Sequence, residues 1–194
     1  MLKPITLMKY TIHNEEIVYD GFLKIKKADI THDRFHQKDP VSYDREVLDK
    51  GDCIAVLLYE KDSDSLLLIK QFRYPTIKNT YGWFVELPAG AIENNEEPVV
   101  AAYREVKEET GYEVKHLEKV TTFYATPGSS SERMFLFYGE VDTKDKIEKG
   151  GGATYEDEDI EIVKLPVQDI KMTLIENTIP DAKTIIALQW FLIR

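Results

Sequence analysis

Three glutamates, Glu105, Glu108 and Glu109, occupy neighbouring positions of one predicted helix. Like charges three or four residues apart on a helix repel, and each such pair costs about 0.2 to 0.5 kcal/mol. Water and counter-ions on a solvated face can offset that cost, and so can a bound cation. Mg²⁺ prefers oxygen ligands and is usually held by one or two carboxylates together with substrate phosphates. The cluster is therefore a candidate site for a hard divalent cation.

An apolar stripe on the same helix helps to decide between these interpretations. Apolar residues recur at the spacing i, i+3, i+4 and i+7, at Val99, Ala102, Tyr103 and Val106. With successive residues about 100° apart around the helix, Glu105 and Glu109 lie beside this stripe and Glu108 lies a little further round. Carboxylates at the border of a core favour the cation site, although each glutamate taken singly is typical of ordinary helix surface.

The elements around the helix must position these carboxylates. The helix is predicted to begin near Pro98 and to end at Gly111, because proline suits the first turn and glycine suits the position after the last turn. A strand is predicted at residues 84–87. Gly90 then permits a tight backbone turn, so that a preceding carbonyl such as that of Ala89 can face the cation. Taken alone, such a glycine is typical of any strand-to-loop junction.

Arg104 directly precedes the first glutamate of the cluster and carries a permanent, forked positive charge. Such a fork can hold a neighbouring carboxylate, Glu96 or Glu105, in a fixed orientation. By itself, the arginine is typical of a surface salt bridge of little energetic value.

The spacing of these residues resembles the Nudix box, the signature of hydrolases that act on nucleoside diphosphates linked to another group. Gly90 is followed after five residues by Glu96, and after seven more by the run Arg-Glu-Val-Lys-Glu-Glu-Thr-Gly-Tyr at residues 104–112. Tyr112 is the one departure, because the pattern usually has an aliphatic residue there. Seven fixed identities arise by chance on the order of 10⁻⁸ per starting position, so the resemblance is specific.

The resemblance implies an α/β/α sandwich, in agreement with the α+β order of the predicted elements. It implies that Glu105 and Glu109 are metal ligands and catalytic groups, with Glu108 acting through water or a second ion. The expected cofactor is Mg²⁺, with Mn²⁺ as a substitute, which would lower the pKa of a bound water for attack on phosphorus. Neither a nucleophilic residue nor an organic cofactor is expected.

Further segments resemble one branch of the family, the pyrophosphatases of ADP-ribose and GDP-mannose. These segments are residues 44–46, 69–73, 86–90, 126–133 and 156–160. The resemblance implies that Arg45 and Arg73 contact substrate phosphates or the adjoining sugar, and a guanidinium suits a diphosphate in an acidic protein. Glu132 lies on a Gly/Ser-rich loop, where a mobile carboxylate can bind a substrate hydroxyl or assist catalysis. Ordinary surface residues are the alternative for all three.

Glu158 belongs to an acidic run at residues 156–159, a pattern that in isolation is typical of a solvated turn. The run follows three glycines at residues 150–152, which would form a hinge and let the loop move over a bound substrate. In the similar pyrophosphatases the acid at this place is a metal ligand or the catalytic base. That role is assigned to Glu158, and a substrate contact to Asp157; which acid takes the proton stays open.

The expected substrate is a small molecule, a nucleoside diphosphate sugar, and two kinds remain open. Residues 131–133 and 186–190 resemble the ADP-ribose enzymes, whereas residues 150–152 with 156–159, and residues 181–184, resemble the GDP-mannose enzymes. Lys183 can meet a phosphate or a base edge, or be a surface lysine. A Nudix-like sensor that binds without catalysis is the main alternative, which the intact glutamates disfavour. A purely structural acidic domain would leave the spacing of the glycines and the arginine unexplained.

Composition limits the partners and the compartment. The chain has 194 residues, 43% of them hydrophobic, and a formal net charge of −10. The acidic balance disfavours nucleic acid and membrane surfaces, because no basic stretch is present to bind them. The single cysteine, Cys53, allows no internal disulfide and indicates a core thiol in a reducing compartment. With no secretory signal and no run of about 20 apolar residues, a cytoplasmic enzyme is expected.

Two regions are expected along the chain. Residues 46–194 are predicted to form the Nudix domain, with strands at 54–59, 66–72, 117–124, 133–141 and 159–165 and helices at 167–177 and 181–194. Residues 1–45 alternate apolar and polar residues in places, which predicts strands. In the similar pyrophosphatases this region forms a small antiparallel sheet that is exchanged across a twofold homodimer, and the resemblance implies the same here.

Overall fold

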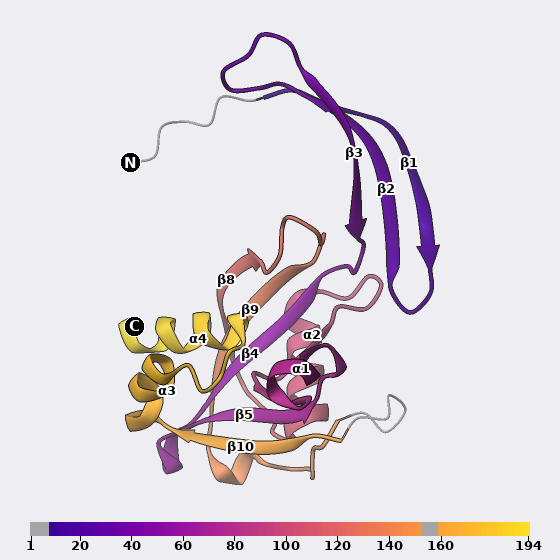
Figure 1. Ribbon diagram of the computed structural model, residues 1–194. Helices are drawn as coiled ribbons and strands as arrows, with labels where there is room; N and C mark the ends of the chain where they lie inside the picture. Colours follow the sequence, from indigo (N-terminus) through magenta and orange to yellow (C-terminus); the bar gives the residue numbers. More distant parts are fainter. Residues whose placement is uncertain (1–7, 153–158) are drawn as a thin grey trace. The chain divides into compact units, whose positions relative to one another are not determined.

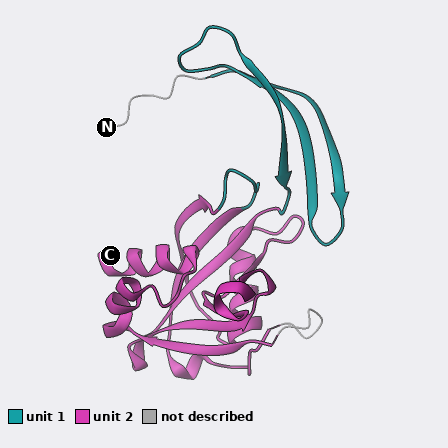
Figure 2. Ribbon diagram, viewed as in Figure 1, with its two compact units in different colours: residues 1–50, 126–132 teal, residues 51–125, 133–194 magenta. Residues whose placement is uncertain are grey.

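The computed structural model describes residues 8–152 and 159–194, and the chain divides into two compact units (Figure 2). The first unit contains Met1–Lys50 and Thr126–Glu132, and the second contains Gly51–Ala125 and Arg133–Arg194. The Gly/Ser-rich loop therefore groups with the N-terminal strands, from which it is remote in the sequence.

The first unit is a three-stranded antiparallel sheet in the order β1-β2-β3. Its strands are β1 (Tyr10–Asp20), β2 (Lys24–His32) and β3 (Val41–Leu48). Every residue of β1 is exposed, and among the residues of these three strands Ala28 alone is buried. The predicted small N-terminal sheet is thus confirmed, and it buries little apolar surface of its own.

The second unit contains a seven-stranded mixed sheet whose main path is β10-β5-β4-β9-β8. Neighbouring strands are antiparallel, except that β4 and β9 are parallel. The strands are β4 (Cys53–Glu60), β5 (Ser65–Phe72), β6 (Trp83–Glu86), β7 (Ala89–Ala91), β8 (Leu117–Tyr124), β9 (Arg133–Val141) and β10 (Glu161–Pro166). The central strand β4 is an almost unbroken apolar run, as expected when helices cover both faces of a sheet.

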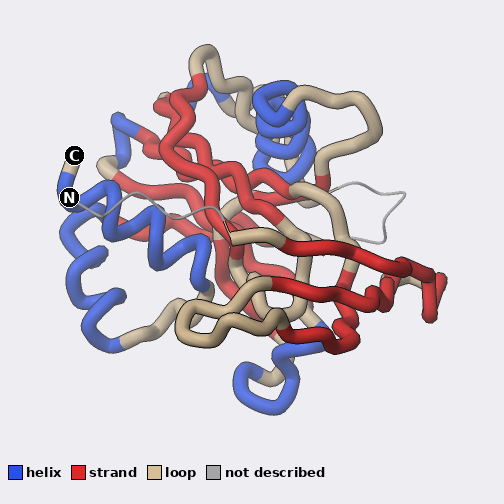
Figure 3. The backbone as a smooth tube through the Cα atoms, turned by 90° about the horizontal axis from the view of Figure 1, so that it is seen from above, coloured by secondary structure: helices blue, strands red, loops and turns tan. Residues whose placement is uncertain are grey.

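Helices lie on both faces of this sheet (Figures 1 and 3). One face packs against α2 (Pro98–Glu105), which continues without a break as the π-helical segment η3 (Val106–Thr110). The other face packs against α3 (Ile170–Glu176) and α4 (Ala182–Ile193). The predicted α/β/α sandwich is confirmed, with a separate apolar core on each side of the sheet.

Short helical turns connect the remaining elements. They are η1 (Lys61–Ser63), η2 (Tyr74–Thr76), α1 (Ile77–Thr80), η4 (Thr143–Asp145) and η6 (Val167–Asp169). None of the helices in the described part of the chain is long and apolar enough to cross a lipid bilayer.

The strands predicted at residues 54–59 and 66–72 are confirmed as β4 and β5, which form a hairpin but part beyond their turn. They pair with each other only over Leu58–Glu60 on the β4 side. Further from the turn, β6 pairs with β5 through Glu86, and β7 pairs with β4 through Ala89. This fork brings residues 86–90 into the middle of the sheet.

One position of the predicted apolar stripe is wrong. Val99 lies in the first turn of α2 and is 37% exposed, whereas Ala101 is fully buried. The other stripe residues, Ala102, Tyr103 and Val106, are buried or pack against the core. The helix therefore turns the predicted face toward the sheet everywhere except at its first turn.

A buried glutamate accounts for the tyrosine that departs from the Nudix pattern. Glu60, at the end of β4, is fully buried, and its carboxylate accepts hydrogen bonds from the hydroxyls of Tyr112 and Ser63 and from the ammonium of Lys164. Burial, together with the hydrogen bond to Glu60, raises the pKa of the Tyr112 hydroxyl well above its usual value. The tyrosine thus ties the end of the glutamate helix to β4 and β10.

Tyr112→Phe is expected to lower the free energy of unfolding by about 1 to 3 kcal/mol, because it removes one donor from a buried carboxylate. Urea unfolding measures the change. Tyr124→Phe is the matched control, since Tyr124 is 55% exposed, and it is expected to change stability by less than about 0.5 kcal/mol. Equal stabilities of the two variants would contradict this role of the Tyr112 hydroxyl.

Candidate active site

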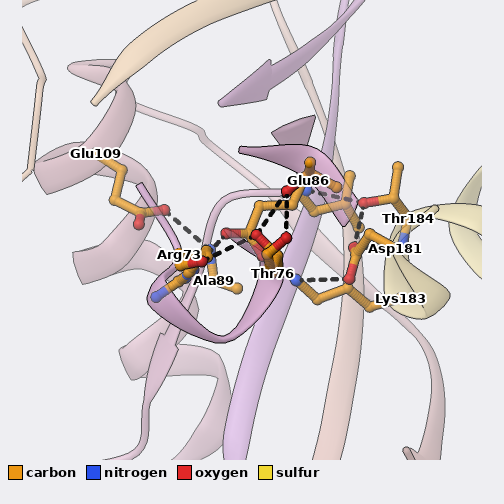
Figure 4. A network of polar contacts seen from close by, with 10 residues as sticks. Arg73, Thr76, Glu86, Ala89, Glu109, Asp181, Lys183 and Thr184 are labelled. Carbon is orange, nitrogen blue, oxygen red and sulfur yellow. Dashed lines mark hydrogen bonds and ion pairs between the residues drawn. The ribbon is translucent and has the colours of Figure 1, made fainter. Parts of the chain in front are cut away.

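Residues 86–90 join β6 to β7, and their backbone is held from both sides of the sheet. The N–H group of Leu87 donates to the hydroxyl of Thr184 on α4 (3.0 Å). The N–H group of Ala89 donates to the carboxylate of Glu109 (2.9 Å), which is only 1% exposed (Figure 4). One short segment therefore fixes the orientation of the last glutamate of the cluster.

Glu105 lies against Gly90, and this contact explains why a glycine is needed. A Cβ atom added at Gly90 would overlap the Glu105 carboxylate. Gly90 lies within β7 and does not have a positive φ, so the predicted tight turn is wrong. The glycine serves the close approach of a carboxylate to its backbone. Glu105 and Glu109 thus reach two consecutive residues of β7, Gly90 and Ala89.

Arg104 binds three carboxylates around it. Its Nε and Nη2 atoms donate to Glu96 (3.1 and 3.0 Å), and Nη1 donates to Glu105 (2.7 Å) and Glu108 (3.3 Å). Nη2 also donates to the carbonyl of Ala91 (3.1 Å). The hydrogen bonds to Glu96 and Glu105 raise the pKa of the arginine further above its usual value. Both pairings expected from the sequence are present, and Glu108 is an additional one.

The last turn of the glutamate helix is π-helical and is capped by glycines. Gly111 ends η3 with a φ of 74°, as expected for a glycine that follows a helix. The N–H group of Gly151 donates to the carbonyl of Glu109 (2.9 Å), and the glycines at 150–152 all have positive φ. The structure therefore gives this triplet a capping role, and the hinge stays a prediction. Neither the π-helical turn nor the cap is evident from helix periodicity.

Two predicted substrate contacts, Arg73 and Lys183, meet at Glu86 (Figure 4). The Nε atom of Arg73 donates to one carboxylate oxygen of Glu86 (2.7 Å), and the ammonium of Lys183 donates to the other. Lys183 also donates to Asp181 (3.1 Å). The side chain of Arg73 is 41% exposed, whereas that of Lys183 is 12% exposed. Arg73 thus keeps surface for a ligand, and Lys183 is largely engaged with protein carboxylates.

Arg45 and Glu132 belong to the first unit, whereas the glutamate helix belongs to the second. The Arg45 guanidinium stacks on the ring of Tyr43, 4.1 Å from its centroid, and donates to the carbonyl of Asp44 (3.1 Å). The Glu132 carboxylate accepts from the ammonium of Lys50 (2.8 Å). Their contacts with a substrate stay predictions.

The carboxylates beside β7 fit a divalent cation by their chemistry. Within residues 8–152 and 159–194, no three His, Cys, Asp or Glu side chains form a ready-made metal-binding group. Glu105 is instead held by Arg104, and Glu109 by the N–H group of Ala89. These are hard oxygen donors at a place that a Cβ of residue 90 would fill, and such donors are the kind that Mg²⁺ prefers. The predicted ligand Glu158 and the predicted contact Asp157 lie outside the described residues.

Two acids of this site, Glu86 and Asp181, are not predicted from the sequence. Glu86 is 3% exposed and holds both Arg73 and Lys183, but a glutamate in a predicted strand gives no sign of its partners. Asp181 accepts from the N–H group of Thr184 (3.0 Å) and so caps α4. The signal for this cap is present in the sequence, because an aspartate just before a helix is a preferred capping residue.

The comparison with known families decides the class of the protein. Residues 49–189 match the model of the NUDIX domain, and this range includes the whole glutamate helix. The chain belongs to the Nudix family. Two relatives match more than nine tenths of this chain, so the similarity extends beyond the glutamate helix to the first unit as well.

These two relatives carry different substrate names. The chain is 36% identical to a GDP-mannose pyrophosphatase of Cronobacter sakazakii, over 93% of this chain and 96% of the relative. It is 34% identical to an ADP-ribose pyrophosphatase of Haemophilus influenzae, over 92% of this chain and 84% of the relative. A solved structure of an ADP compounds hydrolase superposes with a TM-score of 0.71, covering 96% of this chain and 94% of the other at 22% identity. That likeness supports the Nudix fold.

Proposed function

We propose that this Nudix protein hydrolyses the pyrophosphate bond of a nucleoside diphosphate sugar, of the GDP-mannose or ADP-ribose type, to a nucleoside monophosphate and a sugar phosphate. The observation that carries the proposal is the contact of Glu109 and Glu105 with two consecutive residues of β7, Ala89 and Gly90, together with the hydrogen bond by which Arg104 orients Glu105. The two relatives named as pyrophosphatases of GDP-mannose and ADP-ribose support the substrate class.

A divalent cation, Mg²⁺ with Mn²⁺ as a substitute, would be held by Glu105 and Glu109 together with Glu108, the carbonyl of Ala89 and Glu158. When bound there, such a cation neutralises charge on the diphosphate and lowers the pKa of a bound water. The chain itself supplies fixed carboxylates, because Glu109 is buried against a backbone N–H group and Glu105 is paired with an arginine. Their orientation is set before any substrate arrives, which is the arrangement that favours catalysis.

Arg73 is the proposed diphosphate contact in the second unit, since its side chain is exposed beside residues 86–90. Arg45, Glu132 and Asp157 remain proposed contacts with the sugar or the nucleotide. We also retain a homodimer that exchanges the first unit, and a cytoplasmic location, as predictions. The exposure of every residue of β1 supports the first, and Cys53, a buried residue and the single cysteine of the chain, is consistent with the second.

The test is to incubate the purified protein with Mg²⁺ and, separately, with GDP-mannose, ADP-ribose, UDP-glucose, NADH and diadenosine polyphosphates, and to identify the products. We expect a nucleoside monophosphate and a sugar phosphate from at least one of the first two. Glu118→Gln, an exposed position on β8, serves as an active control. Tight binding of one compound without hydrolysis of any would replace the enzyme by a sensor.

Gly90→Ala is expected to lower kcat by about tenfold or more, because small misplacements of catalytic groups are costly. The three atoms nearest to the added methyl group all belong to the far end of the flexible Glu105 side chain, so the melting temperature should change by no more than a few degrees. Gly128→Ala is the matched stability control, because its added methyl group meets no atom within 4 Å. A Gly90 variant with full activity would contradict the close approach of Glu105.

A further inference from the structure

Glu86 is a buried carboxylate whose two oxygens are both engaged by cations. It is 3% exposed, and it accepts from the Nε atom of Arg73 and from the ammonium of Lys183 (Figure 4). A buried charge is tolerated when it is paired and hydrogen-bonded, and leaving one partner out is strongly unfavourable. Glu86, Arg73 and Lys183 therefore form one connected ion-pair cluster. The position of Arg73 depends on the other two residues.

The contact with Glu86 sets the direction of the Arg73 guanidinium. A guanidinium is planar, so a hydrogen bond from Nε to a fixed carboxylate orients its two Nη groups as well. The backbone of Arg73 is fixed too, because its N–H group donates to Gly82 (2.6 Å) and its carbonyl accepts from Thr76 (2.9 Å). Within the described part of the chain neither Nη group makes a hydrogen bond or an ion pair, and the side chain is 41% exposed.

Lys183 is placed differently from a residue that meets a substrate. Its side chain is 12% exposed, and its ammonium lies between the carboxylates of Glu86 and Asp181. Asp181 in turn accepts from the N–H group and the hydroxyl of Thr184 (3.0 and 2.6 Å) at the start of α4. A substrate phosphate would have to compete with two carboxylates for this ammonium. Lys183 is therefore suited to hold Glu86 in place and to balance its charge.

The same segment carries both Glu86 and the residue that binds Glu109. Glu86 precedes Ala89 by three residues, a span of at most about 10 Å of extended chain. The N–H group of Ala89 orients Glu109. The N–H group of Leu87, which lies between Glu86 and Ala89, donates a hydrogen bond to the hydroxyl of Thr184. The segment thus sets a fixed separation between the cationic group at Arg73 and the carboxylates of the glutamate helix, as a diphosphate that bridges them requires.

We propose that Glu86 is a positioning residue that holds Arg73 toward the substrate diphosphate, and that Lys183 acts through Glu86 without touching the substrate. This inference rests on the proposed function, since it assumes that Arg73 meets the diphosphate. It predicts that substitutions of Glu86 or Lys183 change the KM and the Kd for the substrate only when Arg73 is present.

The experiment is a double-mutant cycle with Glu86→Gln, Arg73→Ala and the double variant, measured as kcat, KM and the Kd of the hydrolysed nucleotide sugar. Glu86→Gln keeps the shape of the side chain and removes its charge. We expect it to raise KM about tenfold or more, as for the loss of a charge-assisted hydrogen bond, with a smaller change in kcat. In the Arg73→Ala background it should change KM by less than about twofold, because the two residues act as one. If the changes in KM caused by the two single substitutions simply multiply in the double variant, the inference is overturned.

A second cycle with Lys183→Met and Arg73→Ala covers the case in which the Glu86 variant does not fold, and melting temperatures report folding throughout. Lys183→Met should raise KM in the wild-type background and leave it nearly unchanged in the Arg73→Ala background. A direct contact of Lys183 with the substrate would give the same increase in both backgrounds and would overturn its proposed role. Glu118→Gln and Lys171→Met are the matched controls, since both positions are exposed.

The outcome separates this inference from the proposed function. If the wild-type protein hydrolyses a nucleotide sugar and the cycles show no coupling, the inference fails and the function stands. If the protein binds ADP-ribose or GDP-mannose without hydrolysis, the cycles are measured as Kd by calorimetry. Coupling in Kd would then support the positioning role while the proposed hydrolysis fails, and a lack of coupling would overturn both.

Discussion

Glu109→Gln is expected to lower kcat by at least about 10²-fold, the loss typical of removing one electrostatic catalytic group. Glutamine keeps an oxygen that can accept from the N–H group of Ala89, so the local backbone should stay in place. What disappears is the negative charge of a side chain that is only 1% exposed. The effect should therefore lie in turnover, and unfolding by heat should remain cooperative.

The measurement compares kcat of the wild type and the variant at saturating substrate and Mg²⁺, with circular dichroism melting as the check on folding. Glu113→Gln, four residues further along the chain at an exposed position, is the matched control and should keep full activity. A folded Glu109→Gln protein with wild-type kcat would remove Glu109 from the catalytic groups.

Arg104→Met is expected to have the second large effect, on stability as well as activity. The change leaves Glu96, Glu105 and Glu108 close together without the guanidinium that joins them. Removing one partner of a buried ion pair costs about 3 to 5 kcal/mol. The Arg104 side chain is 25% exposed, and solvent screening reduces the expected loss in unfolding free energy to about 2 to 3 kcal/mol.

Urea unfolding and kcat test this expectation together. Arg133→Met is the matched control: Arg133 also makes two hydrogen bonds to a carboxylate, that of Asp52, but its side chain is 46% exposed. Such surface pairs contribute about 0 to 1 kcal/mol. Added Mg²⁺ should restore part of the stability of the Arg104 variant, because a cation that binds only the folded state stabilises it. Equal stability losses in the two variants would contradict the special role of Arg104.

The pH dependence of the free energy of unfolding should also depend on Arg104. The hydrogen bonds from Arg104 hold the pKa of Glu96 below its usual value. A carboxyl with a lowered pKa in the folded state contributes stability above its unfolded pKa, and that stability is lost as the pH falls through the lowered value. In Arg104→Met this acid-sensitive contribution should shrink, so that stability falls less between neutral pH and the pKa range of carboxyl groups.

The sequence predicts those parts of the fold that depend on local patterns. The strands at residues 117–124 and 133–141 coincide with β8 and β9, because each is a run of strand-forming residues between turn residues. The glutamate helix ends at Gly111 as expected. The residue that follows a helix commonly has the left-handed backbone conformation, which glycine adopts most readily. The contacts of Arg104 are also foreseen, because neighbours on one helix follow from spacing.

The parts that depend on pairing between distant segments are not predictable in this way. The strands β4 and β5 separate because β7 pairs with β4 and β6 pairs with β5. The register of these short strands is set by the whole sheet. The need for a glycine at Gly90 arises from Glu105, fifteen residues away, and the sequence suggests a turn instead. In the same way Glu86 gains its role from Arg73 and Lys183, which come from two other elements.

The central claim is that water attacks phosphorus in a nucleoside diphosphate sugar, and hydrolysis in ¹⁸O-labelled water tests it most directly. Products from GDP-mannose and ADP-ribose are separated and analysed by mass spectrometry. We predict a nucleoside monophosphate and a sugar phosphate, with one ¹⁸O atom in one of these two phosphates. Release of a nucleoside diphosphate and a free sugar, with the label on the sugar carbon, would contradict the claim.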